Sequence, residues 1–382
     1  MGNTYGVFCT TYASATCNTV TTIKHNHHRL RRGIIKSFFS KKYVTGLEHV
    51  VQSEVNLLAS RFTEAYHHGT VLDLKYVFVA LTSDLTTHYV YGTNLNHLAE
   101  PDFKKRLSRG HGQHGSLDPR ATRLRASVEA SRILDSHDNG TMGDQKTLLQ
   151  AMATADVPEE EKTATRLQME TLNIIAGGTE TTARALAVGV FHLAHKPSLL
   201  LQLRDELRTV MPFPDSLASC TQLEQLPYSY LAGVVNESLR LAFGFIIRSA
   251  RVYPNDPLVY EDLVIPSPPG TPISQSAYFV CMDPSIFPQP DDFNADRWVQ
   301  AARDGNKLHR YLIVFSKGSR HCLGINFALA EIYLAIATVA RRFDLVPYQT
   351  TVEQLQMKRD LGFTAPEKGP FTVRAKVTGL AD

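Results

Sequence analysis

The sequence predicts a mainly helical chain with a small β region, and three features support this prediction. Between residues 44 and 66 the apolar side chains recur at steps of four, four, three and four, which is the spacing of an amphipathic helix. A second helical run, rich in Ala, Leu and Ile, ends near Arg341. Strand patterns are short: residues 258–260 and 263–265 flank a tight hairpin turn, and two further strand-like segments follow.

Composition narrows the class of protein. The chain has 382 residues, of which 43% are hydrophobic and 20% charged, so it can bury a sizeable core. A net charge of +3 is too mild to indicate nucleic-acid binding. The 5 cysteines are odd in number and contain no C-x-x-C pair, which predicts neither a disulfide framework nor a zinc site and fits a reducing compartment. No apolar run is long enough to span a membrane, and the start of the chain does not resemble a secretory signal.

The most informative stretch runs from Phe315 to Gly324 and reads FSKGSRHCLG. Cys322 stands just before the Ala-rich helical run, so its sulfur should lie at a helix N-terminus, where the dipole and free N–H groups favour thiolate. Gly318 and Gly324 permit close approach to a flat ligand, and Arg320 offers a fork of donors for a carboxylate. A soft thiolate in an electropositive loop is a ligand for iron. The alternative is a buried structural cysteine beside a helix cap.

The spacing F-x-x-G-x-R-x-C-x-G resembles the haem-binding loop of the cytochrome P450 family, whose haem is held by a Cys thiolate. The resemblance implies that Cys322 is the iron ligand of haem b and that Phe315, Arg320 and Gly324 lie around the cofactor. It implies the cytochrome P450 fold, mainly α with a small β region. We expect this fold to be incomplete at the N-terminus, because the membrane helix, hinge and first sheet of eukaryotic members are missing ahead of the first motif.

A basic run near the start of the chain is a candidate site for the haem propionates. His28 and Arg32 are four residues apart, so a helix would place both on one face. The run resembles the family helix that holds a propionate with an aromatic residue or His and an Arg, and Arg251 matches a second propionate arginine. The alternatives are a solvated basic face, an incidental metal-binding His cluster and, for Arg251, an ordinary surface arginine.

A Gly- and Thr-rich interruption lies inside an otherwise strong helical pattern. Gly177 and Gly178 each weaken a helix by about 1 kcal/mol, and a following threonine can bond back to a carbonyl one turn earlier and bend the helix. The segment resembles the pattern G-x-[DE]-T-[TS] of the family's long central helix. By that resemblance Thr181 donates a hydrogen bond to dioxygen and Glu180 relays protons from solvent. The alternative is a packing site between helices.

Glu237 and Arg240 are three residues apart in an apolar stretch, and a buried pair of this kind must satisfy itself or be costly. E-x-x-R alone is not informative. The resemblance makes it the family's core pair, joined by Arg297 of the segment Asp296-Arg297-Trp298. The implied role of the three charged residues is to lock the fold around the Cys322 loop.

The domain organisation follows from the spread of these motifs. Residues 1–24 are unpatterned and we expect them to be poorly ordered. Residues 25–382 are predicted to form a single haem-binding domain, because the motifs must converge on one cofactor. Family members place the roof of the substrate pocket in the region 94–144, which is shortened here and expected to be flexible or partly helical. A nucleic-acid-binding patch there would lack interleaved aromatic residues.

The resemblance implies a haem-dependent monooxygenase that inserts one oxygen atom of O2 into a lipophilic small molecule, by hydroxylation or epoxidation, as in fungal secondary metabolism. Electrons would come from NADPH through a flavin-containing reductase docking near Lys317 and Arg320, and we expect a monomer. Family members lie on the cytosolic face of the endoplasmic reticulum, but this chain carries no anchor and is expected to be soluble in the cytoplasm. Two alternatives remain: a haem-thiolate isomerase or dehydratase, and a truncated, inactive remnant with or without haem. The candidate pocket residues are Ile174, Ala176, Phe243, Phe245, Ile246 and Phe363, all apolar.

Overall fold

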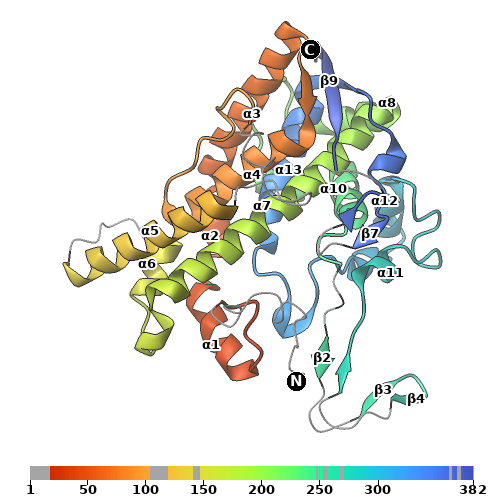
Figure 1. Ribbon diagram of the computed structural model, residues 1–382. Coiled ribbons are helices and arrows are strands. Elements are labelled where there is room, and N and C mark those ends of the chain that lie inside the picture. Colours follow the sequence, from red (N-terminus) through yellow and green to blue (C-terminus); the bar gives the residue numbers. More distant parts are fainter. Residues whose placement is uncertain are drawn as a thin grey trace.

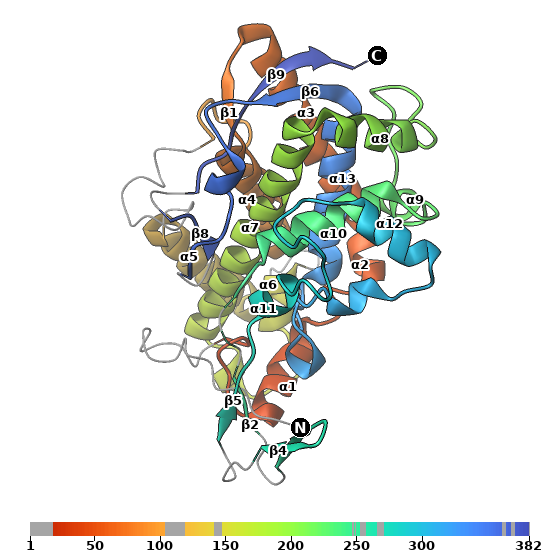
Figure 2. The same cartoon turned by 90° about the vertical axis from the view of Figure 1, so that its right-hand side faces the viewer.

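The computed structural model describes residues 18–103, 119–140, 147–246, 248, 250–252, 257–265, 271–360, 364–367 and 371–381. Helices dominate this part of the chain, as predicted. The longest, α7 (Ala164–His195), crosses the middle of the molecule (Figure 1). It packs against α4, α5, α10 and α13, and one continuous apolar core joins them. Figure 2 shows α4 and α13 on either side of α7.

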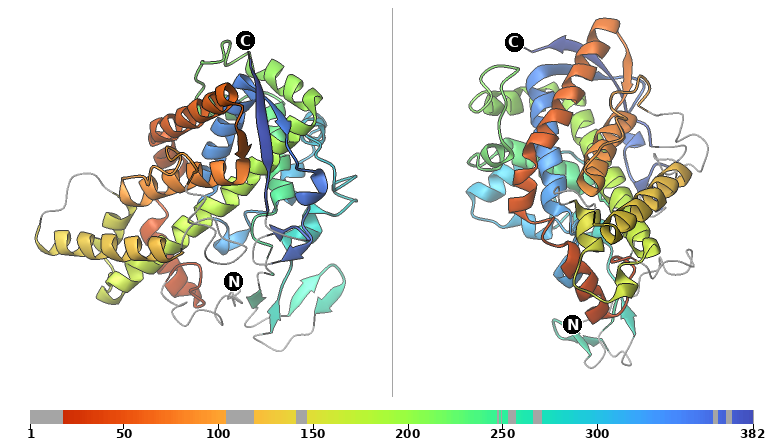
Figure 3. Two further views of the ribbon diagram at one scale, coloured as in Figure 1. Left: turned by 45° about the horizontal axis from the view of Figure 1, so that its top comes forward. Right: turned by 90° about the vertical axis from the view of Figure 1, so that its left-hand side faces the viewer.

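The remaining helices surround α7 (Figure 3). They are α1 (His25–Ile35), α2 (Lys41–Gly46), α3 (Glu48–His68), α4 (Leu74–Tyr91), α5 (Pro119–Asp138), α6 (Leu148–Ala153), α8 (Pro197–Leu207), α9 (Cys220–Glu224), α10 (Tyr230–Ala242), α11 (Ala277–Cys281), α12 (Asp296–Arg303) and α13 (Ile325–Arg342). Short 3₁₀ turns are η4 (Glu159–Glu161), η5 (Leu308–Tyr311), η6 (Gly318–Arg320) and η7 (Val352–Gln354).

Side-chain caps fix where the main helices begin. The Thr163 hydroxyl accepts the N–H of Arg166 at 3.3 Å and starts α7. The Ser229 hydroxyl accepts the N–H of Ala232 at 3.0 Å and starts α10. Pro197 occupies the first turn of α8, where its missing N–H costs nothing. α7 therefore ends at His195 and α8 begins at Pro197.

The strands form small antiparallel sheets. The largest has the order β1-β9-β6, with Leu72 opposite Ala375 in the first pair and Leu345 opposite Val377 in the second. The predicted hairpin is confirmed as β3–β4 and protrudes at the bottom of Figure 1. The strands are β1 (Val71–Asp73), β2 (Arg251–Val252), β3 (Leu258–Tyr260), β4 (Leu263–Ile265), β5 (Pro272–Ile273), β6 (Phe343–Pro347), β7 (Arg359–Asp360), β8 (Thr364–Ala365) and β9 (Arg374–Leu380).

Two expectations from the sequence are wrong. The single helix expected at residues 44–66 is two helices, α2 and α3, because the backbone of Leu47 leaves helical geometry with φ −97° and ψ 6°. Of the N-terminal segment 1–24, the described part is not poorly ordered. Thr19 and Thr22 are each 4% exposed and hydrogen-bonded to the rest of the protein. Periodicity cannot reveal such contacts, because they join segments far apart in the sequence.

Residues 94–144 were expected to be flexible or partly helical. The structure contains α5 in this region, and its residues Ala126, Ala130 and Ile133 are buried. The carbonyl of Arg123 accepts a hydrogen bond from the Gln168 amide of α7 at 3.1 Å. Residues 104–118 and 141–146 lie outside the described residues, as do residues 1–17. Among the helices that are described, none combines the length and apolar character needed to cross a membrane.

Candidate active site

The loop ahead of α13 presents Cys322 at a helix N-terminus. Gly318 has a φ of +75°, a left-handed conformation that favours glycine, and it opens the short turn η6. The N–H of Cys322 donates to the carbonyl of Phe315 at 2.7 Å and closes the loop. Cys322 itself is exposed, and α13 begins three residues later. This is the position predicted from the sequence.

Protein atoms around Cys322 displace water from its thiol. This desolvation raises the pKa of the thiol, whereas the N–H of Gly324 and the charge of Arg32 lower it by less. A bound metal ion would add the positive charge that favours thiolate, since a coordinating thiol is deprotonated by the ion it binds.

Four predicted basic residues converge beside this loop: His28 and Arg32 of α1, Arg251 of β2 and Arg320 of η6. Burial, together with the charges of Arg320 and Arg32, lowers the pKa of His28 to about 4. Burial, together with Arg251 and Arg32, lowers the pKa of Arg320 to about 10. The Nε atom of Arg320 makes no hydrogen bond to any described residue. Cationic side chains that lower one another's pKa in this way form a site for an anionic group such as a carboxylate.

The cationic residues tie α1 and the segment before it to the Cys322 loop. Arg32 donates to the carbonyl of His321 at 3.0 Å. Arg320 donates to the carbonyls of Thr22 and Ile23 at 2.7 and 3.1 Å. Sequence reasoning predicted the basic residues but not these main-chain partners, one of which is 298 residues away along the chain.

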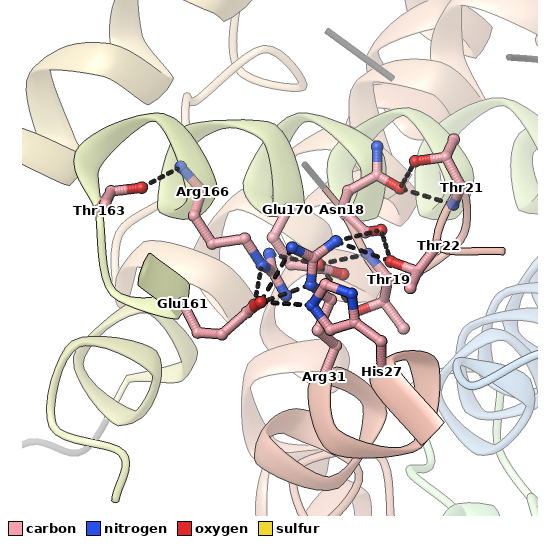
Figure 4. Close-up of polar contacts among 10 residues, drawn as sticks. All are labelled: Asn18, Thr19, Thr21, Thr22, His27, Arg31, Glu161, Thr163, Arg166 and Glu170. Carbon is pink, nitrogen blue, oxygen red and sulfur yellow. Dashed lines mark hydrogen bonds and ion pairs between the residues drawn. The ribbon is translucent and has the colours of Figure 1, made fainter. Parts of the chain in front are cut away.

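A buried charge network anchors the same segment on its other side (Figure 4). The N–H and hydroxyl of Thr19 donate to a Glu170 oxygen at 2.7 and 2.8 Å. Arg31 donates two hydrogen bonds to Glu161, at 2.7 and 3.0 Å. Arg166 donates to Glu161 at 3.1 Å and to Glu170 at 2.6 Å. The sequence reasoning missed this network. Residues 159–161 form the short turn η4, and α7 starts only at Ala164.

In the middle of α7, one face of the helix is not covered by other segments of the described chain. Ala176 and Gly177 are exposed, and Glu180 and Thr181 are half-buried, at steps of three and four that define one helix face. On the opposite face Thr179 is fully buried. The hydroxyl of Thr181 donates to the carbonyl of Gly177 at 2.7 Å, the bond one turn back that the sequence predicted.

The predicted pocket residues fall into different environments. Ile174 is half-buried on α7 and Ala176 is exposed. Phe243 and Ile246 are buried with Cys281 in a small apolar cluster apart from the main core. Phe245 is 38% exposed, and Phe363 lies outside the described residues. The described members of this set therefore do not share one environment.

The predicted charged core is present. Glu237 and Arg240 are both 0% exposed, and Arg240 donates to Glu237 at 2.9 and 2.6 Å. The third predicted partner, Arg297, approaches Glu237 at 3.3 Å. Sequence reasoning missed a fourth, since the indole N–H of Trp298 donates to Glu237 at 2.8 Å. Arg240 also donates to the carbonyl of Cys281 at 2.9 Å, so the group joins α10 to the loops that follow it.

These observations fit haem. The exposed Cys322 can bind iron, and the cluster of His28 and three arginines can bind propionate carboxylates. Ala176 and Gly177 are exposed, and a Cβ atom added at Gly177 would meet nothing within 4 Å. The fold and the site together define a haem-thiolate protein.

Comparisons with known proteins agree. A family model described as Cytochrome P450 matches residues 112–373. Cytochrome P450 monooxygenase aflU of Aspergillus parasiticus is 83% identical over 389 aligned residues, which cover 95% of this chain and 77% of the relative. Cytochrome P450 monooxygenase astB of Aspergillus terreus is 37% identical over 398 residues, covering 95% of this chain and 77% of the relative. Cytochrome P450 monooxygenase TRI4 of Fusarium sporotrichioides is 38% identical over 370 residues, covering 89% and 70%.

The chain belongs to the cytochrome P450 family. The prediction of a haem-dependent monooxygenase of the fungal secondary-metabolism type is confirmed at this level. As a member of the family it binds haem through a thiolate and acts on a substrate with electrons from a redox partner. The names of the relatives favour monooxygenation over the isomerase, dehydratase and inactive alternatives.

Proposed function

We propose that this monooxygenase hydroxylates or epoxidises a lipophilic small molecule, with electrons that reach it from NADPH through a flavin-containing reductase. The observation that carries the proposal is the convergence of an exposed thiol at the start of α13 with a cluster of basic side chains from α1, β2 and η6. A soft ligand and an anion site side by side match the iron and the propionates of one haem.

The proposed haem contacts follow from that geometry. Cys322 is the iron ligand, and the backbone around Phe315 and Gly324 holds the sulfur at the helix terminus. Arg320 binds a propionate with the side of its guanidinium that is not committed to the carbonyls of Thr22 and Ile23.

His28, Arg32 and Arg251 complete the carboxylate site. His28 is neutral near pH 7, because its pKa is lowered to about 4, and can therefore act as a hydrogen-bond donor or acceptor rather than as a cation.

Glu180 and Thr181 are the proposed proton path. The Thr181 hydroxyl is anchored to the Gly177 carbonyl, so its position on the uncovered face of α7 is fixed. Glu180 is half-buried and exchanges protons with solvent, which it passes to Thr181. Haem, when bound with a thiolate ligand, supplies the redox chemistry that cleaves the O–O bond. The protein residues deliver protons to the oxygen atoms and hold the substrate above them.

The remaining proposals concern surroundings and partners. Of the predicted pocket residues, Ile174 and Ala176 on α7 remain the candidates for an apolar substrate environment, which would fit a lipophilic substrate. The exposed Lys317 marks the reductase surface on the Cys322 side, whereas Arg320 is turned inward to Thr22. We propose a monomer that works at the cytosolic face of the endoplasmic reticulum.

The reduced carbon monoxide difference spectrum of the purified protein tests the haem ligand. We expect the strongly red-shifted Soret band of thiolate ligation in the native chain and its loss in Cys322→Ala. Cys220→Ala, which removes a buried thiol from α9, is the matched control and should keep the band. A native protein without haem, or a red-shifted band that survives in Cys322→Ala, would show that the proposed ligand is wrong.

A further inference from the structure

The back of the central helix is held by hydroxyl groups from α4. Thr82 and Thr86 lie one turn apart on α4 and are 0% and 1% exposed. The Oγ1 atom of Thr82 lies 3.0 Å from the carbonyl oxygen of Thr179 in α7. A Cβ atom built on Gly178 would lie 2.9 Å from Oγ1 of Thr86, so only glycine lets the helices come this close.

The contact of Thr82 falls on the turn of α7 that carries the proposed proton path. In a regular helix the carbonyl of Thr179 accepts the N–H of residue 183. That carbonyl has two lone pairs, so it can accept the Thr82 hydroxyl in addition to the helical N–H, and a side-chain donor at this place helps to set the geometry of the turn. On the other side of the same turn, the Thr181 hydroxyl bonds to the Gly177 carbonyl at 2.7 Å. Side chains thus engage two carbonyls of one turn, from opposite faces.

The single proton of the Thr82 hydroxyl has two close acceptors. The Oγ1 atom lies 2.8 Å from the carbonyl oxygen of Phe78, one turn back in α4, and 3.0 Å from that of Thr179, with the carbonyl oxygen of Val79 farther away at 3.4 Å. Bonding back to its own helix is common for threonine and needs no functional explanation. Thr87 shows that ordinary case, since its hydroxyl bonds to the Ser83 carbonyl at 2.8 Å and to no described residue of α7. The bridge to α7 is what distinguishes Thr82.

We propose that Thr82 is a positioning residue for proton delivery, acting through the backbone of Thr179 to set the turn that carries Glu180 and Thr181. Thr86 and Gly178 fix the distance at which this bridge can form. The inference rests on the proposed function of Glu180 and Thr181. It adds a residue of α4 that touches neither cofactor nor substrate.

Two measurements on the full-length, haem-loaded chain test this inference without a known substrate or reductase. In the first, chemically reduced protein is mixed with air and its reoxidation is followed at the Soret band across the neutral pH range. With haem bound, reoxidation would move one electron from ferrous iron to dioxygen and would consume one proton, leaving ferric iron and a hydroperoxyl radical, and Thr181 would supply that proton. In the second, hydrogen exchange is measured for α7 peptides that cover residues 177–183.

The expected results separate Thr82 from its neighbours. Glu180→Gln and Thr181→Ala should flatten the pH profile of reoxidation, and Thr82→Val should flatten it in the same way. Thr82→Ser, which keeps the hydroxyl, should restore the native profile, and Thr87→Val should leave it unchanged. Exchange in residues 177–183 should become about fivefold faster in Thr82→Val, the factor for the loss of one hydrogen bond, but should not change in Thr87→Val.

Each other outcome overturns a stated claim. An unchanged profile in Glu180→Gln and Thr181→Ala would contradict the proposed proton path itself. A changed profile in those two variants with a native profile in Thr82→Val would contradict only the role of Thr82, as would equal effects of Thr82→Val and Thr87→Val. If Thr82→Val does not take up haem, Thr82→Ala replaces it. If neither takes up haem while Thr87→Val does, Thr82 is structural and the inference is wrong.

Discussion

Replacement of Glu161 by glutamine tests the buried charge network of Figure 4. The Glu161 side chain is 7% exposed and accepts hydrogen bonds from Arg31 at 2.7 and 3.0 Å and from Arg166 at 3.1 Å. The Nε2 atom of His27 lies 2.5 Å from Oε1 of Glu161, the oxygen that also accepts the 3.0 Å bond from Arg31. Glutamine keeps the shape and one acceptor, but it removes the charge that the two buried guanidinium groups face.

The size of the effect follows from the pKa of Glu161. Burial alone would raise the pKa, but hydrogen bonds from Arg31 and His27, and the charge of Arg31, outweigh it and lower the pKa from 4.5 to about 2. At about 1.4 kcal/mol per pKa unit this amounts to about 3 kcal/mol of folding free energy. Because the folded-state pKa is the lower one, this stabilisation is fully present above about pH 4.5 and is lost as the pH falls toward 2.

Urea unfolding at neutral pH and in acid measures this prediction. Glu161→Gln should lower the free energy of unfolding by about 3 kcal/mol at neutral pH, and the difference from the native protein should shrink as the pH falls below 4.5. The matched control is Glu160→Gln, since Glu160 is the exposed neighbour and should change stability by less than about 0.5 kcal/mol. A loss that is equal at both pH values, or no larger than that of the control, would refute the reasoning.

Two further predictions concern stability. Gly233→Ala should destabilise the protein by about 1–3 kcal/mol, because the added Cβ would lie 2.6 Å from the carbonyl oxygen of Ala295. Gly33→Ala should stabilise it by up to about 1 kcal/mol, because its Cβ would meet nothing within 4 Å. Urea unfolding of both variants checks this prediction, and equal effects would contradict it. Glu331 is fully buried and receives no hydrogen bond from the part of the chain described, so burial raises its pKa well above 4.5. Since the unfolded state loses this proton more readily, Glu331→Met should stabilise by about 1–3 kcal/mol, and by more as the pH rises above 4.5. Thermal unfolding at two pH values tests it, and a lower melting temperature for the variant at both would exclude it.

Much of the candidate site could be predicted from the sequence, because each of its parts is made of residues that lie close together along the chain. The Cys322 loop, the Thr181 turn and the Glu237–Arg240 pair each depend on residues within about one or two helical turns, and spacing along the chain fixes which side chains share a face. The same reasoning predicted the bond from Thr181 back to Gly177, which the structure contains.

Other features could not be predicted, because they join distant segments. Arg31 and Glu161 are 130 residues apart, and Thr82 and Thr179 are 97 apart. The basic run offered two helix faces, and nothing in its sequence showed that Arg31 would turn to a glutamate while Arg32 turned to the Cys322 loop.

By itself, then, the sequence determined the mainly helical architecture and the helix that carries Glu180 and Thr181, since these are set by periodicity and by hydrogen bonds within a turn. The Cys322 loop was recognised by its resemblance to the haem-binding loop of the family. The tertiary structure alone decided which charges are buried, which are paired and how far the Cys322 thiol is desolvated. The burial, pairing and desolvation of a side chain depend on the groups that surround it in space. Burial changes the free energy of a charged side chain far more than the residues next to it in the sequence do.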